Sequence, residues 1–328
     1  MRGGEKQTFI SYPYATACIR SMEGTMLRLQ EYKELAAIRQ VPECINRLRA
    51  LGFFEGINAS LEELLSYEQE RTLKLLSRCV SDLSSFSIFF LPHQFHNLKA
   101  AVKSLNTSIH PTPIYYDGEF DKRELIETSI VNKAFDHLPD YMQKTAKEAY
   151  KVYLHSGDGM LSDTLIDRGL LEAVKRMGEA SQETAIKQYA KTYLSLANLK
   201  LSFRLVRWET SSSFLEQALV EGGEFSKDRL KTAILSGKQE LISYLNSTSY
   251  REGVTAYQNS PATFECWCDK ELYRKVAAGK SNSFSLGPLV AFFVARENEM
   301  KSLRFLFTGI KNQLSEEWIL ERMRTVYE

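Results

Sequence analysis

The chain has 328 residues, of which 44% are hydrophobic and 25% charged, which is typical of a globular protein with a hydrophobic core. Lysine and arginine (42) nearly balance aspartate and glutamate (41), and a formal net charge of +1 creates no overall field towards nucleic acid or anionic lipid. The five cysteines are an odd number without the spacing of a disulfide framework, which indicates a reducing compartment.

The N-terminus and the most apolar stretch both indicate a soluble protein. Residues 1–9 are polar and lack the apolar core of a signal peptide. A membrane-spanning helix needs about 20 apolar residues. The best candidate, residues 284–295, is shorter than that and contains Pro288. We therefore expect any membrane association to go through a partner or a surface.

Helical periodicity begins near the N-terminus. Apolar residues predict an amphipathic helix over residues 16–38, with an interruption near Gly24. Pro42 opens a shorter helix that ends at Gly52. Ser60 and Glu63 have the spacing of a capping box, which predicts the start of the next helix.

A long apolar-periodic segment follows this capping box. If it continued unbroken from Leu61 to Phe86, it would be roughly 40 Å long at 1.5 Å per residue. Pro92 starts a new helix, because proline is favoured in the first turn. Residues 106–118, which contain two prolines, are predicted to form an ordered loop or linker.

The rest of the chain keeps the helical pattern. Asp121, Ser226 and Ser315 are predicted helix N-caps, and Ser213 with Glu216 is a second predicted capping box. Because no alternating run of β-branched residues is long enough for a sheet, the predicted fold class is all-α.

Helix boundaries in this part are set by proline, glycine and clusters of small polar residues. Breaks are predicted at Pro139, residues 157–159, near Gly178, and at residues 246–249 and 281–283. Continuous helices are predicted over residues 183–208, from Pro288 to near Gly309, and from Ser315 to the C-terminus.

A three-residue pattern recurs at a constant spacing. Its copies are Asn97-Leu98-Lys99, Asn198-Leu199-Lys200 and Glu299-Met300-Lys301, and the lysines are 101 residues apart (200 − 99 and 301 − 200). Gly118-Glu119-Phe120 is echoed by Gly223-Glu224-Phe225. Coincidence is the weaker explanation, because two equal spacings and this echo agree. A fixed period predicts repeated structural units, here with bounds 1–117, 118–222 and 223–328.

The three lysines would be symmetry equivalents if the units surround an axis. At separations of ~15 Å in water each pair repels by only about 0.3 kcal/mol, whereas a dry core would make such a ring prohibitive. Either the lysines lie on a wet surface, or each pairs locally with a carboxylate. We favour the wet surface of a central opening; the alternative is ordinary surface lysines without a common role.

The motifs of nucleotide binding and nucleophilic catalysis do not occur. The chain has no Gly-x-x-x-x-Gly-Lys-Ser/Thr loop, no Gly-x-Gly-x-x-Gly after a strand and no Gly-x-Ser-x-Gly. We therefore expect no catalytic residues, no cofactor and no direct nucleotide binding.

Metal binding is not expected either. His93 and His96 could share a helix face, but further ligands are not near in sequence. Cys266 and Cys268 are more simply core cysteines. The acidic residues around the 157–159 turn lack EF-hand spacing.

Several segments resemble the C subunit of the V-type and archaeal-type rotary ATPases, which is called the d subunit in the eukaryotic vacuolar enzyme. The resemblance covers nearly the whole chain, and its departures, Gly52-Phe53 and Ser195, are mild. The segments that carry it are Tyr14–Arg20, Leu91–Lys99, Asn198–Lys200 with Arg204, Ala295–Arg304, Thr308–Lys311 and Val326-Tyr327.

This resemblance implies an all-α fold of three similar helical-bundle domains around a pseudo-threefold axis, forming a funnel. It implies a non-catalytic component of the complex, one copy each, on the cytoplasmic face of the membrane-embedded proteolipid rotor ring. The funnel would receive the central-stalk subunits and transmit torque between ATP chemistry in the head and proton or sodium transport. Nucleic acid is not an expected partner.

The expected partner-binding residues follow from the repeat and the resemblance together. We expect nine polar residues to line or brace the funnel: Arg20, Asn97, Lys99, Asn198, Lys200, Arg204, Glu299, Lys301 and Arg304. The alternative function is an α-helical repeat adaptor that scaffolds soluble proteins, although its repeats usually have about 20–50 residues. An enzyme is a more distant possibility.

Overall fold

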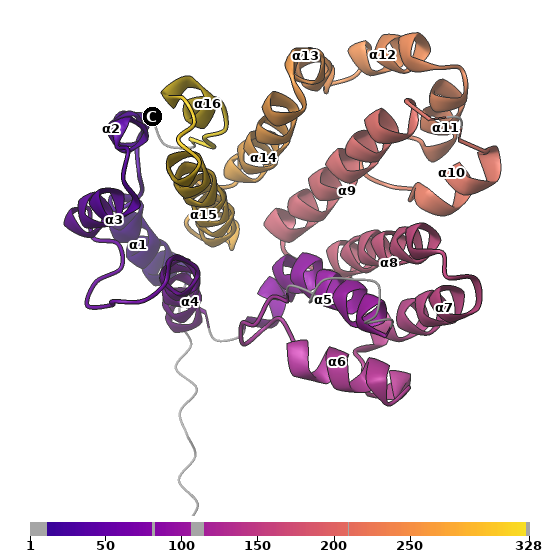
Figure 1. The fold of residues 1–328 in the computed structure, drawn as a ribbon, viewed down its shortest axis with the longest axis horizontal. Coiled ribbons are helices and arrows are strands. Elements are labelled where there is room, and N and C mark those ends of the chain that lie inside the picture. The colour runs from indigo at the N-terminus through magenta and orange to yellow at the C-terminus, as the bar shows by residue number, and fades with distance from the viewer. Residues whose placement is uncertain (1–11, 81–82, 106–114, 209, 326–328) are drawn as a thin grey trace, which may run out of the picture. The chain divides into compact units, whose positions relative to one another are not determined.

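The computed structural model describes residues 12–80, 83–105, 115–208 and 210–325. Within these ranges the chain forms helices and no β-strand; the single isolated bridge joins Gly222 and Phe225. The predicted all-α fold class is confirmed (Figure 1). In the same ranges, no helix is both long enough and apolar enough to cross a membrane.

The chain divides into two compact units, and the first of them joins segments that are distant in sequence. Unit 1 comprises residues 1–83, 183–186 and 245–328, and unit 2 comprises residues 84–182 and 187–244. This division records which segments pack together. It does not test the three repeat bounds or the funnel, which stay predictions.

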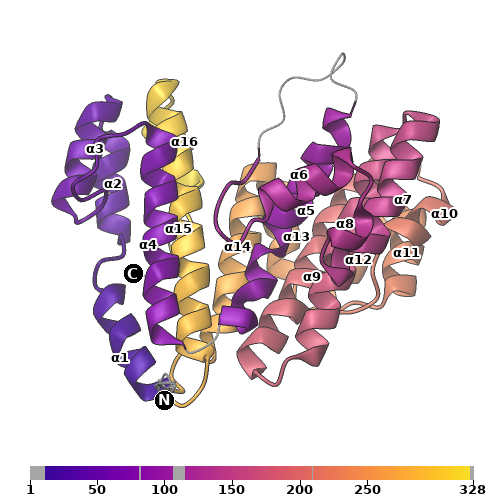
Figure 2. The ribbon, with the colours of Figure 1, turned by 90° about the horizontal axis from the view of Figure 1, so that it is seen from below.

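Unit 1 is built around its longest helix, α15 (Gly287–Lys311), which packs against helices from both ends of the chain. Figure 2 shows α4 and α15 side by side. Nineteen α15 residues are buried, which explains why its sequence is apolar on nearly all sides. The other helices of unit 1 are α1 (Tyr12–Glu23), α2 (Leu29–Ala37), α3 (Val41–Ala50), α4 (Leu61–Cys79), α13 (Arg251–Asn259), α14 (Pro261–Ala277) and α16 (Glu316–Glu321).

Unit 2 is also helical, with α5 packed against α6, α7 and α8. The pair α7 and α8 is joined by Gly157, whose φ of 65° lies in the left-handed region that glycine adopts readily. Its helical elements are η1 (Leu83–Phe90), α5 (Leu91–Ser104), α6 (Arg123–Val131), η2 (Phe135–His137), α7 (Asp140–Ser156), α8 (Gly159–Ala180), α9 (Thr184–Leu205), α10 (Ser212–Ala218), α11 (Lys227–Leu235) and α12 (Lys238–Asn246).

Most predicted helix starts are confirmed. The Ser60 backbone N–H donates to the Glu63 carboxylate at 2.8 Å, which forms one half of the capping box at the start of α4. Ser226 and Ser315 cap α11 and α16 by accepting from backbone N–H groups three residues later. The helix over residues 16–38 is interrupted after Glu23, as predicted near Gly24.

Two predicted caps are wrong. Asp121 does not cap α6, because its carboxylate accepts from the Gly118 N–H at 2.9 Å and closes the preceding turn, so Lys122 takes the N-cap position. Ser213 does not cap α10 either. Ser211 accepts from the Phe214 N–H instead, and Glu216 faces Lys227 on a neighbouring segment.

Two boundaries differ from those expected. The segment from Leu61 does not form one helix to Phe86, because α4 ends at Cys79 and a 3₁₀ helix covers residues 83–90. The break predicted near Gly178 is confirmed, because α8 ends at Ala180 and α9 begins at Thr184. The last helix ends at Glu321, before the C-terminus. The predicted loop at 106–118 lies mostly outside the described residues, which resume at 115.

Candidate functional site

The three repeat triplets lie on helices α5, α9 and α15, as their periodicity predicted. The asparagines of the first two triplets make the same kind of contact. Asn97 and Asn198 are both buried, and each side-chain amide pairs with the backbone of a later segment. Because each asparagine fixes a connecting segment onto its helix, these residues have a structural reason to recur.

The asparagine contacts are two-way hydrogen bonds. The Asn97 amide nitrogen donates to the Tyr116 and Asp121 carbonyls at 2.8 and 3.0 Å, and its oxygen accepts from the Tyr116 N–H at 2.9 Å. The Asn198 amide donates to the Val220 carbonyl at 2.8 Å and accepts from its N–H at 3.3 Å. Such bonds satisfy backbone groups that would otherwise be buried without a partner.

Two of the repeat lysines pair locally with carboxylates, which is one of the alternatives left open by the sequence. Lys99 contacts Asp167 at 2.6 Å, and Lys301 contacts Asp269 at 2.8 Å. Both lysine side chains keep some exposure, 25% and 42%. Lys200 is half-buried on α9. A central opening shared by the three lysines stays a prediction.

The three candidate arginines lie at or near the surface. Arg20 pairs with Glu23 at 2.8 Å and donates to the Lys280 carbonyl at 3.0 Å, which joins α1 to the segment after α14. Arg204 is exposed near the end of α9. Arg304 donates to the Gln69 side chain at 3.2 Å, across the α4–α15 pair.

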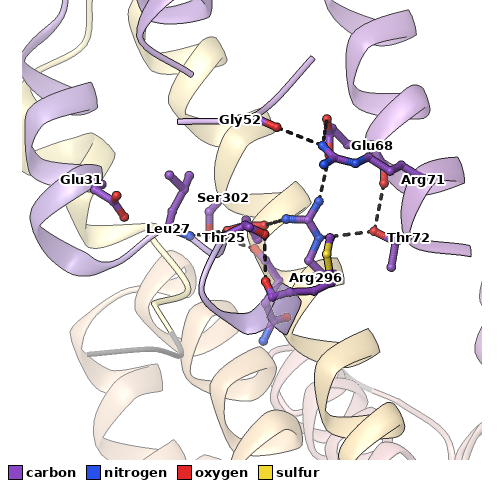
Figure 3. Close-up of polar contacts among 12 residues, drawn as sticks. Thr25, Leu27, Glu31, Gly52, Glu68, Arg71, Thr72, Arg296 and Ser302 are labelled. Atoms are coloured by element: carbon purple, nitrogen blue, oxygen red, sulfur yellow. Dashed lines mark hydrogen bonds and ion pairs between the residues drawn. The ribbon is translucent and has the colours of Figure 1, made fainter. Parts of the chain in front are cut away.

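Glu299, in contrast, belongs to a buried ionic cluster in unit 1 that sequence reasoning did not find. Figure 3 labels two other members of this cluster, Arg296 and Glu68. The Arg296 guanidinium contacts both Glu299 and Glu68, the latter at 2.9 Å. It also donates to the Thr72 hydroxyl at 3.3 Å. Two carboxylates therefore share one buried cation.

The cluster holds two connecting segments against α4 and α15. Glu299 accepts the Leu27 N–H at 2.7 Å, from the connection between α1 and α2, and Glu68 accepts the Phe54 N–H at 2.8 Å. Arg71 adds a bond to the Gly52 carbonyl at 2.9 Å (Figure 3). This arrangement restrains the N-terminal segments of unit 1 relative to its central helix.

Burial raises the pKa of the Glu299 carboxyl, and the adjacent Arg296 partly opposes this effect. A buried ion pair seldom makes a protein more stable than apolar residues of similar size would. It does disfavour alternative arrangements of the helices in which one of the buried charges would lack a partner. A signal was present in the sequence: Glu68 and Thr72 occupy the four-residue spacing between Leu64 and Leu76 on the buried face of α4.

The histidines and cysteines of the candidate metal sites have internal contacts. His93 lies 3.0 Å from an Asp121 oxygen and stacks on Tyr116 with ring centroids 3.9 Å apart. Cys266 and Cys268 are buried and form no disulfide, and the Cys266 thiol donates to the Met323 carbonyl. Within the part of the chain that the structure describes, three or more possible metal ligands do not come together.

Comparison with known proteins gives a consistent result over almost the whole chain. Residues 15–322 match the family model described as ATP synthase (C/AC39) subunit. The C subunit of the V-type sodium ATPase of Enterococcus hirae is 25% identical over 84% of this chain and 85% of its own length. The C subunits of the A-type ATP synthases of Halorubrum lacusprofundi (24% identical; 92% of this chain, 94% of the relative) and Methanocaldococcus jannaschii (23%; 93% and 84%) are also similar.

Proposed function

Because the chain belongs to the ATP synthase (C/AC39) subunit family, and so is a component of a rotary ATPase, we propose that it couples the central stalk to the membrane rotor ring. The observation that carries this proposal is the family match over residues 15–322. In this role the chain is non-catalytic, occurs once per complex, and passes torque between ATP chemistry in the head and transport of protons or sodium ions. It attaches to the cytoplasmic face of the membrane through the ring.

Torque transmission requires a body whose elements do not slide. The buried Glu68–Arg296–Glu299 cluster supports this role, because it ties two N-terminal connections to α4 and α15. The side-chain amides of Asn97 and Asn198, here called the asparagine clamps, hydrogen-bond to backbone groups of later segments and hold those segments against α5 and α9. Packed cores with satisfied polar networks resist deformation.

We propose a division of labour among the nine candidate residues. Asn97, Asn198 and Glu299 brace the structure from within, since their side chains are buried. The other six keep some exposure and would contact the partner subunits: Arg20, Lys99, Lys200, Arg204, Lys301 and Arg304. In this proposal the three repeat units surround a pseudo-threefold axis and form the funnel that receives the stalk.

Native mass spectrometry tests the bridging role. The purified chain is mixed with detergent-solubilised rotor ring and with the soluble central-stalk subunits, separately and together. We expect a ternary complex that contains one copy of this chain. If the folded chain binds neither partner, the coupling role is wrong, and the helical repeat adaptor becomes the better account.

A further inference from the structure

A pocket in unit 1 is left unexplained by the packing described so far. It measures about 340 Å³, within the range of natural binding pockets. It lies between the end of α1, the turn at residues 52–53, the C-terminal half of α4 and the first half of α15. All of these segments belong to unit 1, so the pocket is formed within a single compact unit.

The pocket has an apolar interior and a basic edge. Phe53 and Phe292 are buried in its wall, and Met22, Tyr67 and Leu75 are half-buried around them. On α4 its lining residues fall on one helix face, at spacings of three, four, seven and eight residues. The α4 cations among them are Arg71, Lys74 and Arg78.

The charge balance of the lining is strongly positive. Four of its residues are cations, namely Arg71, Lys74, Arg78 and Arg296, and only Glu68 is a carboxylate. Glu68 is 1% exposed and already accepts from Arg296 and from the Phe54 N–H. The Glu68 carboxylate therefore contributes little negative charge at the mouth of the pocket. Lys74 is 69% exposed and pairs with Glu70 only at 3.4 Å.

We infer that this pocket binds a segment of a central-stalk protein that presents a large apolar side chain flanked by carboxylates. The apolar side chain would fit the walls, and the carboxylates would meet the α4 cations, since arginine forms paired hydrogen bonds with carboxylate. The inference rests on the proposed function. It takes the central stalk as the source of this segment, because in the proposed function the stalk supplies the soluble protein partners of this chain.

Charge reversal at the exposed edge tests this inference. The double variant Lys74→Glu/Arg78→Glu changes two side chains that take no part in the buried cluster. Arg28→Glu/Lys33→Glu is the matched control, because it makes the same change in charge on exposed residues at α2 that do not line the pocket. Circular dichroism melting of both variants checks that they are folded like the wild-type protein.

Binding of the purified central-stalk subunits is then measured by titration calorimetry at several salt concentrations. We expect the pocket variant to bind the stalk subunits about tenfold or more weakly. Its affinity should also depend less on salt concentration, because the attraction between the pocket cations and the partner carboxylates, which salt screens, has been removed. The control should change binding by about twofold or less. Equal effects of the two variants would overturn the inference.

A photo-crosslinking side chain at position 74 identifies the occupant. The expected adduct lies in an acidic stalk segment with an apolar residue between its carboxylates. An adduct with the rotor ring, or with a segment that lacks carboxylates, would overturn the inference and leave the bridging role intact. If the wild-type chain binds none of the stalk proteins, both the inference and the proposed function fail.

Discussion

At the scale of single residues, Arg296 has the largest predicted effect on stability. It is the cation between Glu68 and Glu299, and all three side chains are less than 10% exposed. Arg296→Met would leave two buried carboxylates without it, and we expect a loss of about 3–5 kcal/mol in the free energy of unfolding. Urea denaturation followed by circular dichroism measures this loss.

Arg304→Met is the matched control, because Arg304 lies on the same helix but has a single described bond to a neutral side chain. We expect this substitution to cost less than about 1 kcal/mol. Similar costs for the two variants would mean that the buried cluster does not hold unit 1 together.

The Glu299 carboxyl predicts a specific dependence of stability on pH. Burial raises its pKa in the folded protein, so above its unfolded pKa the folded state binds more protons than the unfolded state. Its contribution to stability is therefore present below the unfolded pKa and is lost as pH rises through the folded pKa. Glu299→Gln removes this titration.

The comparison of melting temperature against pH for wild-type protein and Glu299→Gln isolates this contribution. Starting near the ordinary glutamate pKa of about 4.3, the wild-type protein should lose stability relative to the variant as pH rises. Parallel curves for the two proteins would show that Glu299 does not titrate in this range.

The asparagine clamps predict a local effect. Asn198→Ala leaves the N–H and carbonyl of Val220 without their side-chain partner in a buried place. We expect a cost of about 2–3 kcal/mol and faster hydrogen exchange at the Val220 amide. Asn312→Ala is the control, since this exposed side chain makes one bond, to the Thr308 carbonyl, and should cost less than about 1 kcal/mol. Unchanged exchange at Val220 would contradict the clamp.

These residues show what sequence could and could not predict. The repeat predicted that Asn97 and Asn198 lie on helices. Their hydrogen-bond partners lie 19 and 22 residues later in the chain, and the sequence does not predict how the intervening segments fold back. Glu68 and Arg296 are 228 residues apart, so no local pattern links them. The caps Ser60 and Ser315 could be predicted, because capping depends only on the three residues that follow. The predicted cap Asp121 was wrong, because its carboxylate accepts from the Gly118 N–H instead.

At the scale of helices, Gly178 lies two residues before the end of α8, near the predicted break, and it also allows a close contact between helices. A Cβ atom built at Gly178 would lie 2.3 Å from the Ala190 Cβ, so this glycine permits α8 and α9 to approach closely. The sequence predicted the break near this glycine but not its contact with Ala190, because packing between helices leaves no local pattern. The same limit applied to α4, where only the structure shows the end at Cys79.

Gly178→Val should force these two helices apart. Ala190 has no flexible side chain that could move aside, so we expect a loss of about 1–3 kcal/mol in the free energy of unfolding. Gly159→Ala, at the start of the same helix, meets its nearest atom at 3.9 Å and should be neutral or stabilising by up to about 1 kcal/mol. Equal denaturation midpoints for the two variants would contradict the close contact.

At the scale of the whole molecule, the fold class and the family were accessible from sequence, because periodicity and motifs extend along nearly the entire chain. The composition of the two compact units was not. Unit 1 joins residues 1–83 to residues 245–328, and such long-range packing leaves no periodic signal. The three repeat units remain a proposal about symmetry, alongside the proposed role between stalk and ring.

Ion transport by the reconstituted rotary complex tests the coupling role most directly. Vesicles are prepared from the complex with and without this chain, and ATP hydrolysis and uptake of protons and sodium ions are recorded together. We predict that omission of the chain abolishes ATP-driven uptake while the head still hydrolyses ATP, and that adding the purified chain restores uptake. Equal uptake per ATP without the chain would contradict the account.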